Sequence, residues 1–405
     1  KNKELTSDQD QITKIPRTFD YPTFIRSLNI EFLADAVIEW LQEQELAVYE
    51  TETDSSSGDE SSNDEGISCY DNSNDNLESY ELDEYLVSEL CKLFIKSSRK
   101  ITDLSIVDLS IDGIFVNQIP SYPRNNNCLS HIESLEFDGS FCGKPFITGL
   151  TKFCRNIKTL IIDDMDEDTP FIEELAILIR NQSNLIGFSL SDIPLDMSTV
   201  IRSLESQVDS LKEVIIRDAY IHDKDAIKSL ARCVNIESID LSFEEKKYYK
   251  SFTPLWYCNF NKLKYLGISM YYTWQDPLFI ENIRSFLALN GKNLCGINLC
   301  LTTTIYTEIL RNIGISCPKL SHLEINRIYD GVNYLVELLK LQLPLKKLVI
   351  EYDKSKLHKA NGILPPFKTL RSLDDLATFE IGWIFSTEYL KEIFDDWEWF
   401  CIEKK

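Results

Sequence analysis

The sequence predicts an α/β solenoid, a curved stack of repeated units with a parallel sheet on its concave side and helices on its convex side. Three observations predict it. A short phrase, in which one variable residue separates two aliphatic or aromatic residues, occurs eleven times between Lys100 and Ile384. The first residues of successive phrases lie 25 to 31 positions apart, a period typical of stacked repeats. Each interval has room for the helical crossover that joins two parallel strands.

Each phrase predicts one short strand whose two apolar residues face a shared core. One repeat is too small to cover its own apolar face, but stacked neighbours cover each other and bury a continuous core. The eleven phrases are Leu104/Ile106, Leu135/Phe137, Leu160/Ile162, Phe188/Leu190, Val214/Ile216, Ile239/Leu241, Leu266/Ile268, Ile297/Leu299, Leu323/Ile325, Leu348/Ile350 and Phe379/Ile381.

Apolar residues at helical spacing follow the strands. After the phrase at Leu160, for example, Phe171, Leu175 and Leu178 are three or four residues apart, as on one face of a helix. Asp223 is a suitable N-cap for the helix of a later interval. The repeated unit is therefore predicted to be a strand, a turn and a helix.

The remaining segments complete the predicted domain organisation. Before the first phrase, Leu28 and Ile30 resemble another strand. We expect a flexible linker at residues 1–18, the first strand and helix of the solenoid at 19–42, a disordered acidic insertion at 43–80, and the rest of the solenoid at 81–405 with a capping helix near 387–400.

The acidic charge of the chain is concentrated near its N-terminus. The window from Ser27 to Cys91 holds nineteen acidic residues and no Lys or Arg, so it carries −19 of the net charge of −23. Residues 43–80 hold few large apolar side chains, so their burial cannot offset the entropy lost on ordering. This composition predicts the disordered insertion.

Four serines in this insertion have an acidic residue three positions later, a spacing that acidophilic kinases favour. Phosphates there would deepen the negative field. The alternative is a tract that only solvates the surface. The candidate phosphorylation sites are Ser56, Ser57, Ser61 and Ser62.

A fuller motif points to a family. Residues 317–325 follow the pattern C-P-x-L-x-x-L-x-L, and partial versions begin at Cys154, Cys233 and Cys258. The motif resembles the cysteine-containing class of leucine-rich repeat in F-box/LRR proteins, in their divergent fungal-type families. The resemblance implies a substrate receptor for a cullin-RING (SCF-type) ubiquitin ligase.

The F-box itself is not found in this sequence. If one lies upstream of Lys1, it would bind the Skp-type adaptor, and the repeats would hold the protein target. The alternative is a free-standing LRR interaction scaffold or a regulator of a small GTPase.

The variable residue of each phrase is expected to point into the concavity, where a protein partner would bind. Several of these residues and their neighbours are acidic, which favours a basic target; the alternative is a solvated face. The predicted partner-binding residues are Glu136, Asp138, Asp163, Ser189, Ile215, Asp240, Asn298, Glu324 and Glu380.

A second candidate surface is the aromatic-rich stretch from Phe243 to Phe279. Tyr and Trp are enriched at interface hot spots, so Tyr271, Tyr272 and Trp274 could form a partner-binding ridge. The alternative is that these aromatic side chains pack the long crossovers of this region.

The sequence offers little for enzymatic chemistry, cofactors or metals. Its four histidines form no zinc-binding motif, and it has no P-loop, G-x-S-x-G or G-x-G-x-x-G motif. The eleven cysteines are odd in number and include no C-x-x-C pair, so we expect reduced, buried thiols. An acidic chain without a basic stripe disfavours nucleic acid. No apolar run could span a membrane and no signal peptide is found, so a cytoplasmic or nuclear location is expected.

Overall fold

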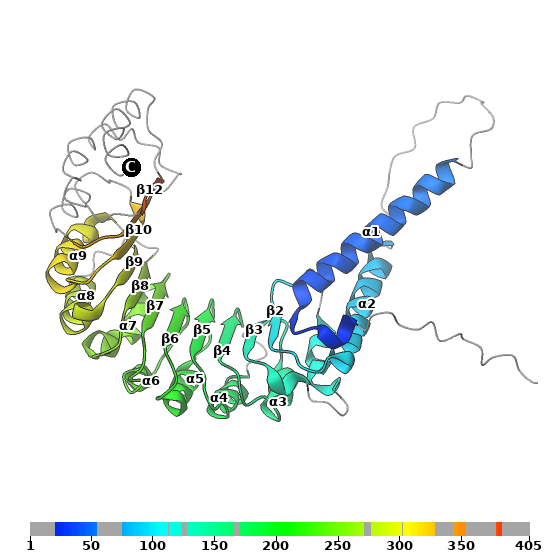
Figure 1. The fold of residues 1–405 in the computed structure, drawn as a ribbon, viewed down its shortest axis with the longest axis horizontal. Helices are drawn as coiled ribbons and strands as arrows, with labels where there is room; N and C mark the ends of the chain where they lie inside the picture. The colour runs from blue at the N-terminus through cyan, green and yellow to red at the C-terminus, as the bar shows by residue number, and fades with distance from the viewer. Residues whose placement is uncertain are drawn as a thin grey trace, which may run out of the picture.

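The computed structural model describes residues 21–54, 75–111, 113–123, 128–165, 171–270, 277–301, 303–328, 343–352 and 378–382. In these ranges the predicted α/β class with a parallel sheet is confirmed. Strands and helices alternate along the chain, and twelve strands form one sheet in chain order. Figure 1 shows an arc with the strands along its inner side and the helices on its outer side. This arrangement is compatible with a solenoid.

All neighbouring strands of the sheet run parallel, and the apolar phrases share one register. Leu104 pairs with Leu135, Leu135 with Leu160, and the same alignment continues to Phe379. The strands are β1 (Ser27–Asn29), β2 (Asp103–Ile106), β3 (Ser134–Asp138), β4 (Thr159–Asp163), β5 (Gly187–Ser191), β6 (Glu213–Arg217), β7 (Ser238–Phe243), β8 (Tyr265–Met270), β9 (Gly296–Cys300), β10 (His322–Ile328), β11 (Lys347–Tyr352) and β12 (Thr378–Gly382).

The crossovers between strands are α-helical, 3₁₀-helical or both. The α-helices are α1 (Ile30–Asp54), α2 (Asp75–Ser97), α3 (Lys144–Thr151), α4 (Ile172–Arg180), α5 (Ser198–Ser203), α6 (Lys224–Leu230), α7 (Lys246–Ser251), α8 (Pro277–Asn290) and α9 (Thr303–Ser316). The 3₁₀-helices are η1 (Tyr21–Phe24), η2 (Ile114–Ser121), η3 (Cys128–His131), η4 (Leu204–Gln207), η5 (Thr253–Tyr257) and η6 (Gly291–Asn293). As predicted, Asp223 caps α6, where its carboxylate accepts a hydrogen bond from the Asp225 amide.

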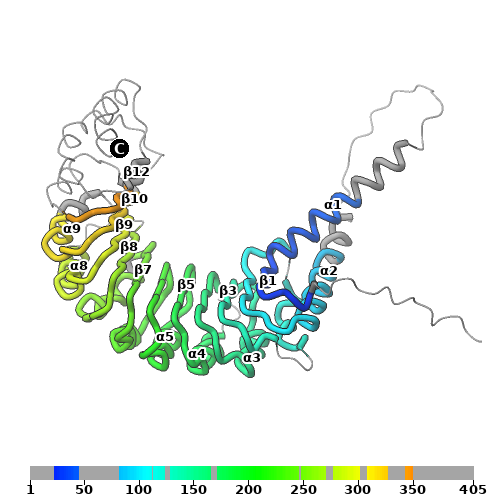
Figure 2. Tube along the Cα trace, viewed as in Figure 1, coloured from blue at the N-terminus to red at the C-terminus, as the bar shows by residue number. Residues whose placement is uncertain are grey.

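The first crossover differs from the expected boundaries. Helix α1 continues to Asp54 and α2 begins at Asp75, so both extend into the segment 43–80 that composition predicts to lack structure. Glu, Gln, Leu and Ala have high helix propensity, and they dominate residues 42–47. Figure 2 shows α1 projecting beyond the arc at the opposite end of the sheet from β10. The linker at 1–18 and the capping helix near 387–400 lie outside the described residues.

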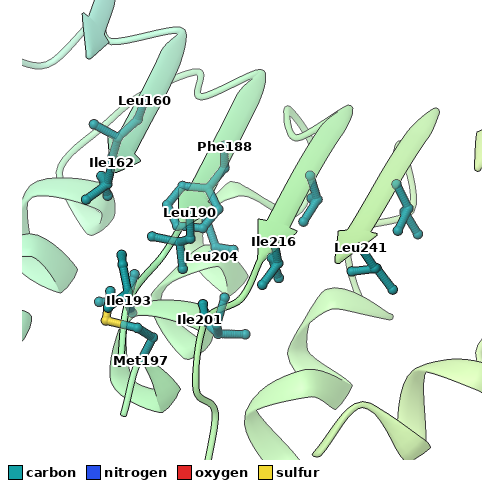
Figure 3. Packing of buried hydrophobic residues seen from close by; sticks show 14 of the residues in the cluster. Leu160, Ile162, Phe188, Leu190, Ile193, Met197, Ile201, Leu204, Ile216 and Leu241 are labelled. Carbon is teal, nitrogen blue, oxygen red and sulfur yellow. The ribbon is translucent and has the colours of Figure 1, made fainter. Parts of the chain in front are cut away.

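The core lies between the sheet and the helices. The apolar phrase residues Leu160, Ile162 and Leu190 are fully buried. Figure 3 shows them together with Met197 and Ile201 from the segment that follows β5. Each repeat therefore contributes its strand residues and its helix residues to one continuous cluster.

The described cysteines are free thiols, as predicted. Three of them connect successive repeats by hydrogen bonds from Sγ to a backbone carbonyl 25 to 33 positions earlier. Cys128 donates to Ile95, Cys154 to Leu129 and Cys233 to Leu204, with donor–acceptor distances of 3.1, 3.2 and 3.7 Å. The thiols thus satisfy buried carbonyl groups at the ends of the preceding helices.

Two buried glutamines connect the repeats in a similar way. Gln182 accepts a hydrogen bond from the Ile157 amide and donates to the Cys154 carbonyl. Gln207 accepts from the Leu185 amide and donates to the Gln182 carbonyl. These side chains complete backbone hydrogen bonding that a turn between repeats would otherwise leave unmade.

Candidate protein-interaction surface

The variable residues of the phrases form one row across the sheet. Ile215 pairs with Asp240, Asp240 with Gly267, and Gly267 with Asn298. Asn298 is exposed, and Asp240 is partly exposed. The row therefore crosses strands β6 to β9, which lie along the inner side of the arc in Figure 1.

A hollow of about 300 Å³ lies on this row over strands β7 to β11. Asp240, Asn298 and Glu324, three of the predicted partner-binding residues, line it. The structure thus brings together residues from strands more than eighty positions apart in the sequence.

Two glycines shape the hollow. A β-carbon at Gly267 would collide with the carboxylate of Asp240, and one at Gly296 would collide with the ring of Tyr265. Both side chains therefore lean over a glycine of the next strand. The two glycines therefore leave the space that the Asp240 carboxylate and the Tyr265 ring occupy.

Hydrogen bonds and one ion pair position the polar groups of the hollow. Arg217 Nη2 donates to Asp240 Oδ2 at 2.5 Å. Asn326 Nδ2 donates to Asn298 Oδ1 at 3.2 Å and to Glu324 Oε1 at 3.0 Å. The carboxylates are therefore held in place before any partner binds.

The lining suits a basic side chain. Tyr265 is 49% exposed and lines the hollow together with Asp240 and Glu324. A ring and a carboxylate together bind guanidinium or ammonium groups by cation–π and charge-assisted interactions. At the other end of the hollow, His322 and Lys347 supply basic groups.

Sequence reasoning missed five polar or glycine residues of the lining: Tyr265, Gly296, His322, Lys347 and Ser238, which stands two positions before Asp240. Tyr265, Gly296 and His322 stand two positions before a variable residue of the row, and so does Lys347 before Val349. Because strand side chains alternate between faces, residues two apart share a face. This periodicity could have identified them.

A second acidic feature lies where strands β2 to β6 end. Asp108, Asp164, Asp192 and Asp218 each adopt a left-handed backbone conformation, with φ between 38° and 55°. Asp tolerates this conformation better than most residues because its side chain can bond locally. The turns place carboxylates in a line beside the concave face.

The carboxylates of this edge lie close enough to repel one another. Burial raises the pKa of Asp138, and the Asp164 and Asp108 charges raise it further. Burial also raises the pKa of Asp163, together with the charges of Glu136 and Asp138. The carboxylates gathered at this edge favour a negative potential, which attracts basic groups.

The other predicted residues have different surroundings. Ser105 Oγ donates to Glu136 at 2.9 Å. Ile215 is partly exposed, whereas Ser189 is only 8% exposed and offers little contact surface. Glu380 lies on β12, where only the backbone is described. The candidate phosphorylation sites Ser56, Ser57, Ser61 and Ser62 lie outside the described residues.

Part of the aromatic stretch from Phe243 to Phe279 lies in the hydrophobic core. Tyr249, Phe252 and Trp256 are fully buried. The rings of Tyr249 and Trp256 pack against Phe279, and the ring of Phe252 packs against Phe243. Tyr271, Tyr272 and Trp274 lie outside the described residues, so a ridge formed by them stays a prediction.

Two further expectations concern metals and membranes. Across the described residues, no group of three or more His, Cys, Asp or Glu side chains is arranged to hold a metal ion. Every helix in the same ranges is too short or too polar to cross a bilayer.

No protein-family model matches this chain, and the search of curated proteins found no match.

Proposed function

We propose that this chain is a protein-recognition solenoid of the cysteine-containing leucine-rich-repeat class, and that it holds the target of an F-box receptor in a cullin-RING ubiquitin ligase. In this role it recognises a protein and contains no catalytic residue of its own. The adaptor would bind a separate F-box, and the site of action would be the cytoplasm or the nucleus.

The cysteines support the leucine-rich-repeat class. In the motif at residues 317–325, Cys317 directly follows helix α9, and the apolar pair Leu323 and Ile325 lies on β10. The equivalent thiols of Cys154 and Cys233 donate to carbonyls of the preceding repeat. The motif therefore has a physical role in stacking, which a chance match would lack.

The hollow on the concave face carries the recognition function. It combines two positioned carboxylates and an exposed tyrosine on one continuous sheet. Binding sites on such scaffolds need polar groups whose orientation is fixed in advance. Glu324 and Asp240 meet this requirement, and they favour a basic target segment.

The experiment that tests the proposal uses the intact protein, affinity-purified from the cells that make it. A Skp-type adaptor and a cullin should co-purify with the protein. The half-life of the captured target should lengthen in cells from which the gene for this chain is deleted. A stable target captured without adaptor or cullin would indicate an interaction scaffold instead. Adaptor, cullin and target all failing to co-purify would contradict both functions.

A further inference from the structure

A second hollow, of about 310 Å³, lies at the amino ends of the strands in the same part of the sheet. Its lining includes Lys262, Lys264, Lys319, Asn293, Cys295 and Glu237. These residues come from the turns that precede strands β7 to β10. None of them belongs to the concave-face hollow.

Consecutive residues connect the two hollows. Glu237, Lys264 and Cys295 line the second hollow, and the residues that follow them, Ser238, Tyr265 and Gly296, line the first. The two hollows therefore lie on adjoining sides of the same strand ends. A single bound polypeptide can reach both.

The second hollow is basic within a strongly acidic chain. Its three lysines face one carboxylate, so its lining carries a net charge of +2, whereas the whole chain carries −23. A basic hollow within an acidic chain is the place where the electrostatic potential most favours an anion.

Most of this positive charge is not neutralised internally. Glu237 lies between two lysines, with Lys264 Nζ at 2.5 Å and Lys212 Nζ at 3.6 Å. Lys262 Nζ donates to the neutral Asn235 Oδ1 at 2.6 Å. Lys319 Nζ lies 3.4 Å from the neutral Asn293 Oδ1.

Among the described residues, neither Lys262 nor Lys319 has a carboxylate partner. Their ammonium groups can therefore turn toward a ligand without breaking an ion pair. The neutral amides of Asn235 and Asn293 meanwhile hold the two side chains beside the hollow.

We infer that this lysine hollow binds the phosphate group of a phosphorylated segment in a protein partner, beside the concave-face hollow. The inference rests on the proposed function only in that the chain binds a protein. The ammonium groups of Lys262 and Lys319, which have no carboxylate partner among the described residues, offer the charge and the donors that a phosphate dianion requires.

The surroundings favour a protein over other phosphate carriers. Nucleic acid presents a long row of phosphates, whereas this hollow offers two lysines without a carboxylate partner on a chain of net charge −23. A membrane surface rich in anionic lipid would likewise repel a chain of this net charge. A single hollow of this volume accommodates one phosphate with its attached side chain.

Cys295 provides a built-in reporter because its thiol lines the hollow and is partly exposed. The experiment measures the rate of iodoacetamide alkylation of Cys295 in the intact chain by mass spectrometry. O-phosphoserine is the probe, serine is the control, and sodium chloride keeps the ionic strength constant. At about 10 mM probe, an affinity in the millimolar range should slow alkylation at least about 3-fold.

A pair of charge-matched variants tests the assignment to the lysines. Lys262→Gln/Lys319→Gln should lose the protection by O-phosphoserine, while Lys152→Gln/Lys224→Gln should retain it. Lys152 and Lys224 are exposed and lie outside the hollow. The ratio of rates with and without probe is compared within each variant, so an altered basal reactivity of Cys295 does not affect the result.

The outcomes separate the carriers of phosphate. Protection by O-phosphoserine that depends on the two lysines supports the inference. It is overturned if O-phosphoserine gives no protection, if the lysine variant is protected as well as the control, or if only inorganic phosphate, vesicles containing phosphatidylinositol phosphate, or single-stranded DNA protect Cys295. Because no partner is used, failure here leaves the proposed recognition function intact.

Discussion

The Asp240 carboxylate leans over Gly267 of the neighbouring strand, and Arg217 holds it there through an ion pair of 2.5 Å. The absence of a side chain at residue 267 makes room for this arrangement. The hollow on the concave face depends on it, because a larger residue would occupy the space into which Asp240 leans.

Substitution of this glycine should change the hollow more than the stability. In Gly267→Ala the new methyl group meets the end of the Asp240 side chain, which can rotate away. This rotation weakens the exposed ion pair between Asp240 and Arg217. We therefore expect the free energy of unfolding to change by less than about 1 kcal/mol. Urea unfolding measures this change.

Gly139 provides the matched comparison. A β-carbon there would lie 2.5 Å from the backbone oxygen of Asp164 and 3.1 Å from the Cα of Met165, neither of which can move alone. Gly139→Ala should cost about 2 to 3 kcal/mol, because overpacking against backbone forces a shift of the turn. Equal losses of unfolding free energy for the two variants would show that the Asp240 side chain cannot rotate away from the new methyl group.

The buried glutamine between repeats should contribute strongly to stability. Gln207→Leu removes the acceptor for the Leu185 amide and the donor for the carbonyls of Ile179 and Gln182. Because Gln207 is only 2% exposed, water cannot replace these bonds, and we expect a loss of about 3 kcal/mol in unfolding free energy.

The exposed Gln118 is the control for this prediction. Gln118→Leu should change the unfolding free energy by less than about 0.5 kcal/mol. Thermal or urea unfolding that found similar values for the two variants would contradict the structural role of Gln207.

The acidic edge predicts a pH dependence with a definite sign. Burial, followed by the charges of Glu136 and Asp138, raises the pKa of Asp163 above its value in the unfolded chain. The folded state therefore binds the proton more tightly, and ionised Asp163 lowers stability at neutral pH. Asp163→Asn should be more stable than the wild type at neutral pH, by up to about 1 kcal/mol.

This advantage should shrink as the pH falls through the raised pKa of Asp163, because the wild-type carboxyl then becomes neutral. Glu133→Gln is predicted to show the opposite sign. Hydrogen bonding and charge from Lys158 lower the pKa of Glu133, so its contribution to stability is present at neutral pH and lost in acid. Unfolding curves across pH for the wild type and both variants test the two signs together.

The cysteines should differ widely in reactivity toward alkylating reagents. Burial raises the pKa of Cys154, Cys91 and Cys317 to about 12, so their thiolates are scarce and inaccessible in the folded protein. Cys295 is partly exposed. Iodoacetamide at neutral to mildly alkaline pH should label Cys295 well before Cys154, which should react only on unfolding, as peptide mapping by mass spectrometry can determine. Equal labelling rates in the folded protein would contradict this packing.

The strand phrases made the sheet predictable from sequence, because each phrase carries its own local pattern. The pairing of Phe188 with Val214, for instance, follows from aligning two phrases. The reduced cysteines were equally accessible to prediction, since Cys154 and Cys233 stand at a fixed place before a strand. Local sequence was sufficient for these features.

The hollows were not predictable in the same way. Gly267 and Gly296 occupy different positions within their repeats, and only the lateral register brings them together under Asp240 and Tyr265. Likewise, the C-terminal end of α1 and the N-terminal end of α2 lie in a segment that its composition predicts to be disordered. The lengths of these helices depend on local helix propensity as well as on composition. A feature that depends on which residues of neighbouring strands lie side by side can be identified only from the structure.

The most direct test of the central claim is the binding of the captured target to the hollow variant Asn298→Arg. Asn298 is exposed, and an arginine there would fill the hollow and neutralise its carboxylates without touching the core. Asn312→Arg on the outer helix α9 is the control with the same charge change. A concave-face interaction predicts that only Asn298→Arg weakens target binding, by at least about 10-fold. Equal affinities for the wild type and Asn298→Arg would contradict the claim that the hollow binds the target.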